Sequence, residues 1–311
     1  MMKIYILDAF HPAGIELAKQ HAEVICWPDP AISNWPEEAD GVMVRMTPIT
    51  GEQILRAKNL KVICKQGVGF ETIDVATAHK MGIPVCRTPG INSEAVAEMA
   101  LALSLDVARR TSRFDRMLRR GEKIIRPQHL GIEMHGKTIG IVGMGNIGRN
   151  VAKKWIGAFD AKILALDPNA PPDRWIDIPH HRCSSLNELL PQVDLLSLHI
   201  PMRESNRHII GAKEIALMKP NAILINVSRG GLIDEAALFT SLKNGHLFGA
   251  GLDVFEVEPP PPDYPLLSLE NVVATPHAAG GTEETQERSA LQVAQQVIDV
   301  LAGKPPTNQV I

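Results

Sequence analysis

The stretch GKTIGIVGMGNIGRNVAKKWIGAFDAKILALD, residues 136–167, decides the fold class of this chain. Its first apolar, β-branched run, Thr138 to Val142, predicts a buried strand that stops at Gly143-Met-Gly-Asn-Ile-Gly148. Apolar residues at helical spacing follow, and a second apolar run ends at Asp167, nineteen positions past Gly148. That distance is close to the roughly 20 residues typical of a dinucleotide-binding unit. Strand, glycine turn, helix, strand and acid therefore predict a βαβ unit that binds a dinucleotide.

Each part of this motif has a physical role. Gly143 would make the tight turn, Gly145 would leave room for a pyrophosphate, and Gly148 would let the helix pack on the strand. The helix N-terminus offers unpaired N–H groups to the phosphates. Asp167 can accept hydrogen bonds from ribose hydroxyls and would repel a 2′-phosphate, so we expect NAD rather than NADP. The alternative, a glycine turn that binds no nucleotide, is disfavoured by the complete context. The cofactor-binding residues predicted here are Gly143, Met144, Gly145, Asn146, Ile147, Gly148 and Asp167.

The bulk composition is that of an ordinary globular protein of about two domains, with 311 residues, 45% hydrophobic and 22% charged. The formal net charge of −3 gives no reason to expect a nucleic-acid partner. We find no leader-like N-terminus and no apolar segment of about 18 residues, so we expect a cytoplasmic protein that is not membrane-bound. The cysteines, Cys26, Cys64, Cys86 and Cys183, show no metal-ligand spacing, which predicts reduced thiols and no metal site.

The dinucleotide motif opens in mid-chain, after a first α/β unit that already alternates strand-like and helix-like runs. We therefore predict two doubly wound parallel-sheet domains, with a Rossmann NAD-binding domain inserted into a flavodoxin-like substrate domain. The substrate domain would comprise residues 1–97 and 285–311, and the NAD-binding domain residues 98–284. The helices predicted over 92–109 and 283–301 would carry the chain across between them.

Three ionisable residues follow strand-like runs in the second half, namely Arg229, Glu258 and His277. In a doubly wound sheet the carboxyl ends of the strands form the ligand crevice, so these side chains are candidates for one site. A guanidinium can bind a carboxylate, and a histidine held by a carboxylate can shuttle a proton. Singly, each could be a surface ion pair, a solvated loop acid or a helix cap. Together, beside a nicotinamide site, they favour catalysis.

At these residues the chain resembles the D-isomer-specific 2-hydroxyacid dehydrogenases, a family that includes D-3-phosphoglycerate dehydrogenase. The likeness is carried by VSRGGLIDE (227–235), GLDVFEVEP (251–259) and TPHAAG (275–280), and upstream by TPGINSEAVAE (88–98) and HGKTIG (135–140). It covers nearly the whole chain. It implies that Arg229 binds substrate, that Glu258 pairs with the histidine, and that His277 is the acid/base.

The resemblance also implies further site residues. Asp253 would lie near the nicotinamide carboxamide, and the cofactor cleft would be lined by His199, Pro201, Val227 and Ser228 together with Arg229 and His277. Substrate would be held by Arg45, Gly67, Val68 and Gly69 together with Arg229 and His277. Phe70 and Met46 stand at variable positions of the family, which leaves the substrate open.

The resemblance thus implies an NAD-dependent oxidoreductase for a small D-2-hydroxy acid or 2-keto acid, such as 3-phosphoglycerate, glycerate/hydroxypyruvate or glyoxylate. It also implies a homodimer formed through the nucleotide domain, with residues 92–120 as the natural contact. No C-terminal regulatory domain is expected in a chain of this length. The alternative is an NAD(H)-sensing binding protein, resembling the corepressors built on the same fold.

Overall fold

The computed structural model describes residues 2–310, which form two compact units. One unit runs to Asn92 and resumes at Gly281, and the other is the continuous segment Ser93–Gly280. The sequence placed the two divisions at 97/98 and 284/285, a few residues later in each case. No helix within residues 2–310 has the length and apolar character needed to cross a membrane.

The first unit is built on a five-stranded parallel sheet in the order β2-β1-β3-β4-β5. This is the flavodoxin-like order, in which the direction of winding reverses beside the first strand. Its strands are β1 (Lys3–Ile6), β2 (Glu23–Cys26), β3 (Gly41–Val44), β4 (Val62–Lys65) and β5 (Val85–Arg87). Its helices are α1 (Pro12–Lys19), α2 (Trp35–Glu38), α3 (Gly51–Arg56), α4 (Val75–Lys80) and α11 (Glu283–Leu301), with the 3-10 turn η1 (Pro30–Asn34).

Successive side chains along each strand of the first unit point to opposite faces of the sheet, so each face carries an apolar layer. Ile4 and Ile6 of β1 pack with Val293 and Val297 of α11, whereas Tyr5 faces the opposite layer. The closing helix α11 lies against α1, and a side chain at Gly14 would collide with the backbone of Ala290. The helix predicted over 283–301 therefore completes the unit that the N-terminal residues begin.

The second unit contains a seven-stranded parallel sheet in the order β12-β11-β10-β9-β6-β7-β8. Its strands are β6 (Thr138–Val142), β7 (Lys162–Leu166), β8 (His181–Arg182), β9 (Leu195–Leu198), β10 (Ile223–Asn226), β11 (Gly249–Leu252) and β12 (Val272–Ala274). The order reverses between β6 and β9, and a dinucleotide fold binds its ligand at such a reversal.

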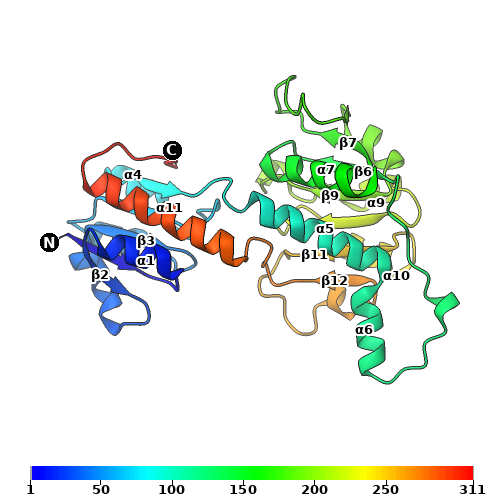
Figure 1. The fold of residues 1–311 in the computed structure, drawn as a ribbon, viewed down its shortest axis with the longest axis horizontal. Helices are drawn as coiled ribbons and strands as arrows, with labels where there is room; N and C mark the ends of the chain where they lie inside the picture. Colours follow the sequence, from blue (N-terminus) through cyan, green and yellow to red (C-terminus); the bar gives the residue numbers. More distant parts are fainter. Residues whose placement is uncertain (1, 311) are drawn as a thin grey trace. The chain divides into compact units, whose positions relative to one another are not determined.

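Helices cover both faces of this sheet (Figure 1). Those of the second unit are α5 (Ser93–Arg109), α6 (Thr111–Arg119), α7 (Asn146–Phe159), α8 (Leu186–Leu189), α9 (Ala212–Leu217) and α10 (Glu235–Lys243). Short 3-10 turns are η2 (Arg126–Gln128), η3 (Leu190–Gln192), η4 (Glu204–Asn206) and η5 (Pro265–Ser268). One apolar layer joins α5 and α7 to the sheet through Leu103 and Trp155, and the other contains Leu189 and Leu238. The predicted fold class is confirmed in both units.

Candidate active site

The glycine turn after β6 has the geometry that its sequence predicts. Gly143 has φ +103°, and a Cβ there would lie 2.3 Å from the carbonyl oxygen of His199, which follows β9. A Cβ at Gly148 would lie 2.2 Å from the carbonyl oxygen of Gly143. These two glycines therefore allow the turn to lie close to its neighbours. Gly145 differs, because a Cβ there would meet nothing within 4 Å.

That open space lies at the N-terminus of α7, where Gly145 is the N-cap and provides no side-chain cap. The first N–H groups of a helix need partners from outside it, and an anion is a suitable one. The turn therefore leaves room for an anionic group such as a pyrophosphate beside Gly145. Met144 is fully buried beneath it, and Ile147 packs on the layer formed by α5 and α7.

Asp167, at the end of β7, braces the same turn. Its Oδ2 accepts from the Met144 N–H at 2.9 Å and its Oδ1 from the Asn169 N–H at 3.0 Å. Each carboxylate oxygen retains a second lone pair that can accept from a ribose hydroxyl. Sequence reasoning assigned only the ribose role to Asp167, whereas the structure adds a bond that fixes the glycine turn.

Sequence reasoning missed Arg174 and Arg182, which hold the loop after Asp167. Arg174 Nε donates to the Met144 carbonyl at 2.8 Å, and Arg182 Nη2 donates to the Asp167 carbonyl at 2.8 Å. Beside them lies a cavity of about 410 Å³, lined in part by Asn146, Arg149 and Trp175. No local motif marks these arginines, because their partners are backbone carbonyls brought near by the fold.

His199 follows β9, across the reversal from the glycine turn. Its Nε2 lies 2.8 Å from the Ser197 hydroxyl, and its Nδ1 is a buried atom with no partner within residues 2–310. Burial lowers the pKa of His199 to about 3, so the imidazole is neutral at ordinary pH. A neutral ring with one unsatisfied nitrogen suits a polar ligand. Pro201, two residues further on, is exposed.

The turn after β10 carries Val227, Ser228 and Arg229. Buried Asn226 shapes this turn, because its Oδ1 accepts from the Ser228 N–H at 3.0 Å and its Nδ2 donates to the Arg229 carbonyl at 2.9 Å. Val227 is buried. Arg229 Nη1 donates to the Ser228 carbonyl at 2.7 Å. The other guanidinium N–H groups have no partner among the interactions of residues 2–310, which leaves them available to an anion.

Gly230 brings this turn against the loop after β11. A Cβ there would lie 1.8 Å from the Phe255 carbonyl oxygen, closer than any side chain tolerates. Glu258 stands at the end of that loop, and its Oε1 accepts from the Phe255 N–H at 3.1 Å. The VSRGG sequence therefore places Arg229 beside the Glu258 loop because only glycine fits between the two backbones.

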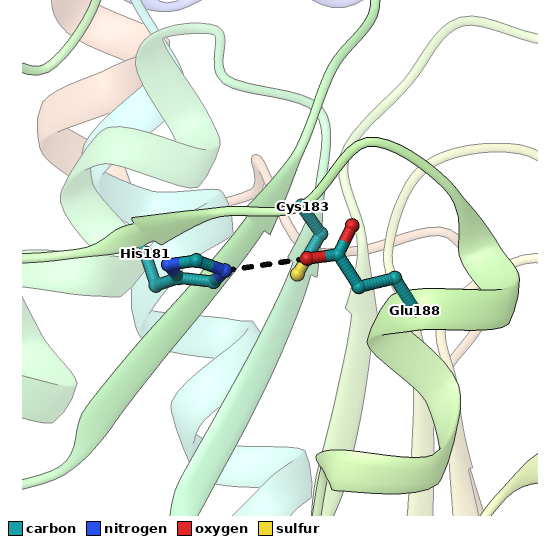
Figure 2. Close-up of side chains that lie close together, drawn as sticks. All are labelled: His181, Cys183 and Glu188. Atoms are coloured by element: carbon teal, nitrogen blue, oxygen red, sulfur yellow. Dashed lines mark hydrogen bonds and ion pairs between the residues drawn. The ribbon is translucent and has the colours of Figure 1, made fainter.

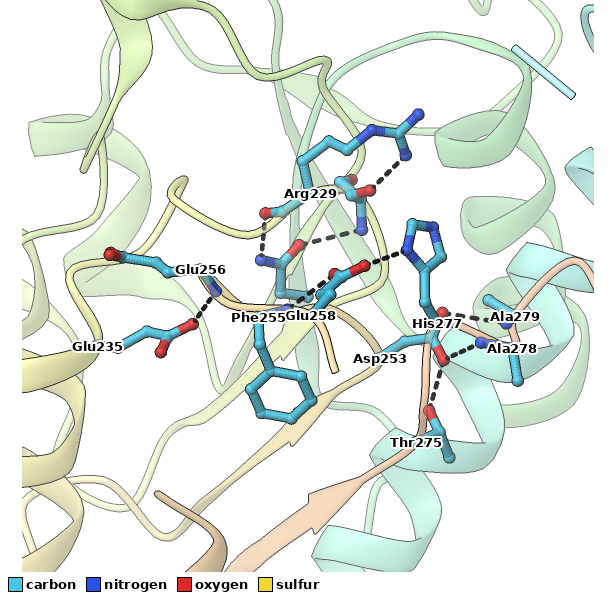
Figure 3. A network of polar contacts seen from close by, with 12 residues as sticks. Arg229, Glu235, Asp253, Phe255, Glu256, Glu258, Thr275, His277, Ala278 and Ala279 are labelled. Atoms are coloured by element: carbon cyan, nitrogen blue, oxygen red, sulfur yellow. Dashed lines mark hydrogen bonds and ion pairs between the residues drawn. The ribbon is translucent and has the colours of Figure 1, made fainter. Parts of the chain in front are cut away.

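His277 and Glu258 form a direct pair (Figure 3). Nδ1 of His277 lies 2.7 Å from Oε2 of Glu258, although 18 residues separate them in the chain. The other ring nitrogen, Nε2, has no protein partner in the described part of the chain. The His277 side chain is 47% exposed, so this nitrogen is accessible to a ligand. A carboxylate on one nitrogen and a free second nitrogen is the arrangement that a general acid/base needs.

Asp253 fixes the backbone that carries His277. Its buried carboxylate accepts from the Thr275 hydroxyl at 2.6 Å and from the N–H groups of Ala278 and Ala279 at 2.8 and 3.0 Å (Figure 3). The Asp253 carbonyl accepts from the His277 N–H at 2.7 Å. His277 has φ +52°, an unfavourable backbone conformation that these bonds hold. Sequence reasoning placed Asp253 near the cofactor and missed this positioning role.

The predicted substrate residues of the first unit lie at the carboxyl ends of β3 and β4. Arg45 directly follows β3, and Gly67, Val68 and Gly69 follow β4. The Gly67 N–H donates to the Thr88 hydroxyl at 2.8 Å. The stretch that starts at Arg45 is held by Asp8, whose carboxylate accepts the backbone N–H of Arg45, Met46 and Thr47. Asp8 was not predicted, since a single acid after a strand carries no specific signal.

The second unit thus combines the glycine turn of a dinucleotide fold with a histidine–carboxylate pair at the carboxyl ends of one parallel sheet. These features define the class of nicotinamide-dependent oxidoreductases. Comparison with known proteins gives the family: residues 101–279 match the profile of the D-isomer specific 2-hydroxyacid dehydrogenase, NAD binding domain. The chain belongs to the D-isomer-specific 2-hydroxyacid dehydrogenase family, as the sequence motifs predict.

Individual relatives agree with this assignment. The chain is 41% identical to a D-3-phosphoglycerate dehydrogenase of Methanocaldococcus jannaschii, over 100% of this chain but only 59% of that protein. It is 43% identical to a hydroxypyruvate reductase of Thermotoga maritima, over 85% of each. The solved structure of a D-2-hydroxyisocaproate dehydrogenase superposes with a TM-score of 0.87 at 29% identity, over 99% of each chain. These relatives are dehydrogenases and reductases, so the corepressor alternative receives no support.

Proposed function

We propose that this protein interconverts a small D-2-hydroxy acid and the corresponding 2-keto acid with NAD(H), and that hydroxypyruvate or glyoxylate is the 2-keto acid. The observation that carries the proposal is the 2.7 Å pair between His277 Nδ1 and Glu258 Oε2. An accessible imidazole held by a carboxylate is the arrangement that transfer of a proton to or from a substrate requires.

The bound nicotinamide would supply or accept the hydride, and the residues of this chain would manage charge and protons. In the reducing direction, protonated His277 would donate from Nε2 to the ketone oxygen, while Glu258 compensates the positive charge at Nδ1. Arg229 would bind the substrate carboxylate and stabilise charge that develops on the oxygen. Its unpaired guanidinium N–H groups support this role.

We further propose that NAD is preferred over NADP. Asp167 places a carboxylate at the end of β7, where it would repel a 2′-phosphate and accept from ribose hydroxyls. The Met144 and Asn169 N–H groups that bind this carboxylate hold it in place beside the glycine turn. The remaining cofactor contacts predicted from the sequence, from His199, Pro201, Val227, Ser228 and Asp253, are part of the same proposal.

The substrate proposal draws on the relatives and on the first unit. The hydroxypyruvate reductase relative is matched over most of its length, whereas the chain spans 59% of the D-3-phosphoglycerate dehydrogenase. A phosphorylated substrate is the second candidate, and Arg45 is the observation that favours it. Arg45 is half-buried at the end of β3, and its guanidinium has no partner in the described structure, which leaves it available to a second anionic group. Gly67, Val68 and Gly69 would bind the carboxylate through their backbone.

The test is NADH oxidation, followed by absorbance, with hydroxypyruvate, glyoxylate, pyruvate and phosphohydroxypyruvate. We expect the highest kcat/KM with hydroxypyruvate or glyoxylate, and phosphohydroxypyruvate as the best substrate would transfer the proposal to the second candidate. His277→Ala should lower kcat by about 10²- to 10⁴-fold without loss of NADH binding. The matched control is His135→Ala, which removes a histidine of the same unit that is 66% exposed. Equal turnover in the two variants would refute the acid/base role.

We propose, finally, a cytoplasmic homodimer formed through the second unit. Leu118, Ile125 and Leu130, in and after α6, are 67%, 47% and 70% exposed, and such apolar side chains favour a protein partner. The four cysteines are free thiols, which agrees with a reducing compartment. Light scattering of Leu118→Glu and wild type tests the dimer: the variant should have half the mass, and equal masses would contradict this contact.

A further inference from the structure

Three potential metal ligands of different chemistry converge at the open edge of the seven-stranded sheet. They are His181 in β8, Cys183 just after it, and Glu188 in α8 (Figure 2). One donor atom from each lies within 4.8 Å of the others. All three belong to one short segment, outside the glycine turn and the acid/base pair. The proposed reaction uses none of them.

Local structure explains how they meet. β8 pairs with β7, and Cys183 extends the pairing by donating its N–H to the Ala165 carbonyl at 2.8 Å. Residues two apart on a strand point to the same side, so His181 and Cys183 share one face. Glu188, in the first turn of α8, reaches back to this face. Figure 2 shows the Cys183 sulfur beside the Glu188 carboxylate oxygen that faces the His181 ring.

The two carboxylate oxygens of Glu188 have different partners. Oε2 accepts from the N–H and from the hydroxyl of Ser184, both at 2.7 Å, and these two bonds order the start of α8. Oε1 lies 3.3 Å from His181 Nε2. The capping interaction therefore needs only one oxygen, and the other is available with the imidazole and the thiol.

These separations suit a tetrahedral ion of borderline softness. Zn²⁺ binds nitrogen and oxygen at about 2.0–2.2 Å and sulfur at about 2.3 Å, which puts ligand atoms roughly 3.3–3.7 Å apart. The N···O separation of 3.3 Å already meets this, and rotation of the exposed His181 ring can adjust the distance from its Nε2 to the Cys183 sulfur. The sulfur and the Glu188 oxygen lie within 4.8 Å of each other, so the Glu188 side chain has to move by about 1 Å at most to complete the set. A set of one sulfur, one nitrogen and one oxygen disfavours Mg²⁺ and Ca²⁺, which bind oxygen.

We propose that His181, Cys183 and Glu188 bind a Zn²⁺ ion, with water as the fourth ligand. Binding replaces the thiol proton of Cys183 with a sulfur–zinc bond and releases that proton to solvent, so affinity rises with pH. Sequence spacing gave no sign of this site, because His-x-Cys-x₄-Glu is not a recurrent zinc pattern. Arg182, between two of the ligands, holds the Asp167 carbonyl, so the ion would stiffen the loop beside the cofactor site.

The full-length protein, kept reduced with a phosphine, would be titrated with Co²⁺ and with Zn²⁺ against a chromophoric chelator. We expect one Co²⁺ per chain with a thiolate charge-transfer band, displaced by Zn²⁺. Cys183→Ser should abolish the band. His181→Gln and Glu188→Gln should each weaken Zn²⁺ binding beyond the about 10- to 100-fold that loss of an outer-shell partner costs.

Cys26→Ser is the matched control, since Cys26 is a free thiol in the first unit, and it should leave the band unchanged. His181→Gln changes a side chain that is 64% exposed, so it tests the site even if Cys183→Ser fails to fold. A band that survives Cys183→Ser in folded protein, or is lost in a Cys64→Ser variant instead, would overturn the proposal. So would Zn²⁺ affinity that His181→Gln leaves unchanged. NADH turnover is not a readout here, and its failure would concern only the proposed reaction.

Discussion

Alanine substitutions of Gly148, Gly145 and Gly157, all in or next to α7, should have three different effects. At Gly148 the new Cβ would lie 2.2 Å from the Gly143 carbonyl oxygen and 3.2 Å from both Ile141 Cγ2 and Trp175 Cζ2. The closest atom is backbone and cannot rotate away, so we take the upper end of the overpacking range, about 3 kcal/mol. Alanine returns up to about 1 kcal/mol of helix propensity. The net loss is about 2 kcal/mol.

The same arithmetic gives the opposite sign at Gly157 and no large change at Gly145. Neither Cβ would meet a protein atom within 4 Å. Gly157 is an exposed interior position of α7, so Gly157→Ala should stabilise the protein by about 0.5–1 kcal/mol. Gly145 is the N-cap, where alanine is less favourable than glycine, so Gly145→Ala should cost about 0.5–1 kcal/mol. Its methyl group would instead occupy the space that we assign to the pyrophosphate.

Calorimetry and an NADH fluorescence titration measure the two effects. For a unit of this size 1 kcal/mol moves Tm by about 2–4 °C, so Gly148→Ala should lower the transition of the second unit by about 4–8 °C. An added methyl group that crowds the pyrophosphate should cost about 1–3 kcal/mol of binding free energy, the range seen when a methylene is forced into a packed core. Gly145→Ala should therefore weaken NADH binding about 5- to 150-fold. Gly157→Ala should bind NADH as wild type does. If Gly145→Ala and Gly157→Ala bind NADH equally well, the pyrophosphate does not lie at Gly145. An unchanged Tm in Gly148→Ala would refute the packing argument.

Two other predictions concern polar groups. Asp253→Asn removes a charged acceptor from the Thr275 hydroxyl and two backbone N–H groups, so His277 should lose its position. Stopped-flow and equilibrium titration should show kcat falling more than tenfold while Kd for NADH changes little, and the reverse pattern would favour a direct cofactor contact. His199 has its pKa lowered to about 3 from 6.5 by burial, so below pH 6.5 the unfolded chain takes up a proton that the folded chain refuses. The free energy of unfolding should therefore fall by about 1.4 kcal/mol per pH unit because of His199 as the pH drops from 6 to 4. Urea unfolding of His199→Gln should show a pH dependence that is shallower by this amount. An equal pH dependence in wild type and variant would show that the folded protein protonates His199.

Local periodicity was sufficient for most of the fold. The apolar runs of β6 and β7 and the helical stripe of α7 lie where the sequence predicts them, because buried strands and amphipathic helices leave patterns a few residues long. The mid-chain position of the glycine motif indicated the inserted unit. Arg229 and Glu258 follow strands in the sequence, which indicated that they lie at the same edge of a sheet, because the carboxyl ends of parallel strands are on the same side.

The residues that hold the site were not predictable in this way. Asp253 and Asp8 accept hydrogen bonds from backbone N–H groups of other loops, and Asn226 bonds to the backbone of its own turn. Arg174 binds the Met144 carbonyl thirty residues away. A side chain that binds backbone leaves no complementary residue type in the sequence. A polar residue at the end of an otherwise apolar strand, as at Asn226 and Asp253, was the available signal. It could have marked both as positioning residues.

The sequence by itself determined the glycine turn, the acid at the end of β7, and the membership of Arg229, Glu258 and His277 in one family pattern, since these depend on residue type and local order. Only the tertiary structure decided that His277 Nδ1 lies 2.7 Å from Glu258, that Asp167 braces the turn it follows, and that His181, Cys183 and Glu188 meet at a sheet edge. The physical reason is that hydrogen bonding and ligation depend on distances of a few ångströms between atoms. Those distances are set by how strands and loops pack, which short-range sequence patterns do not encode.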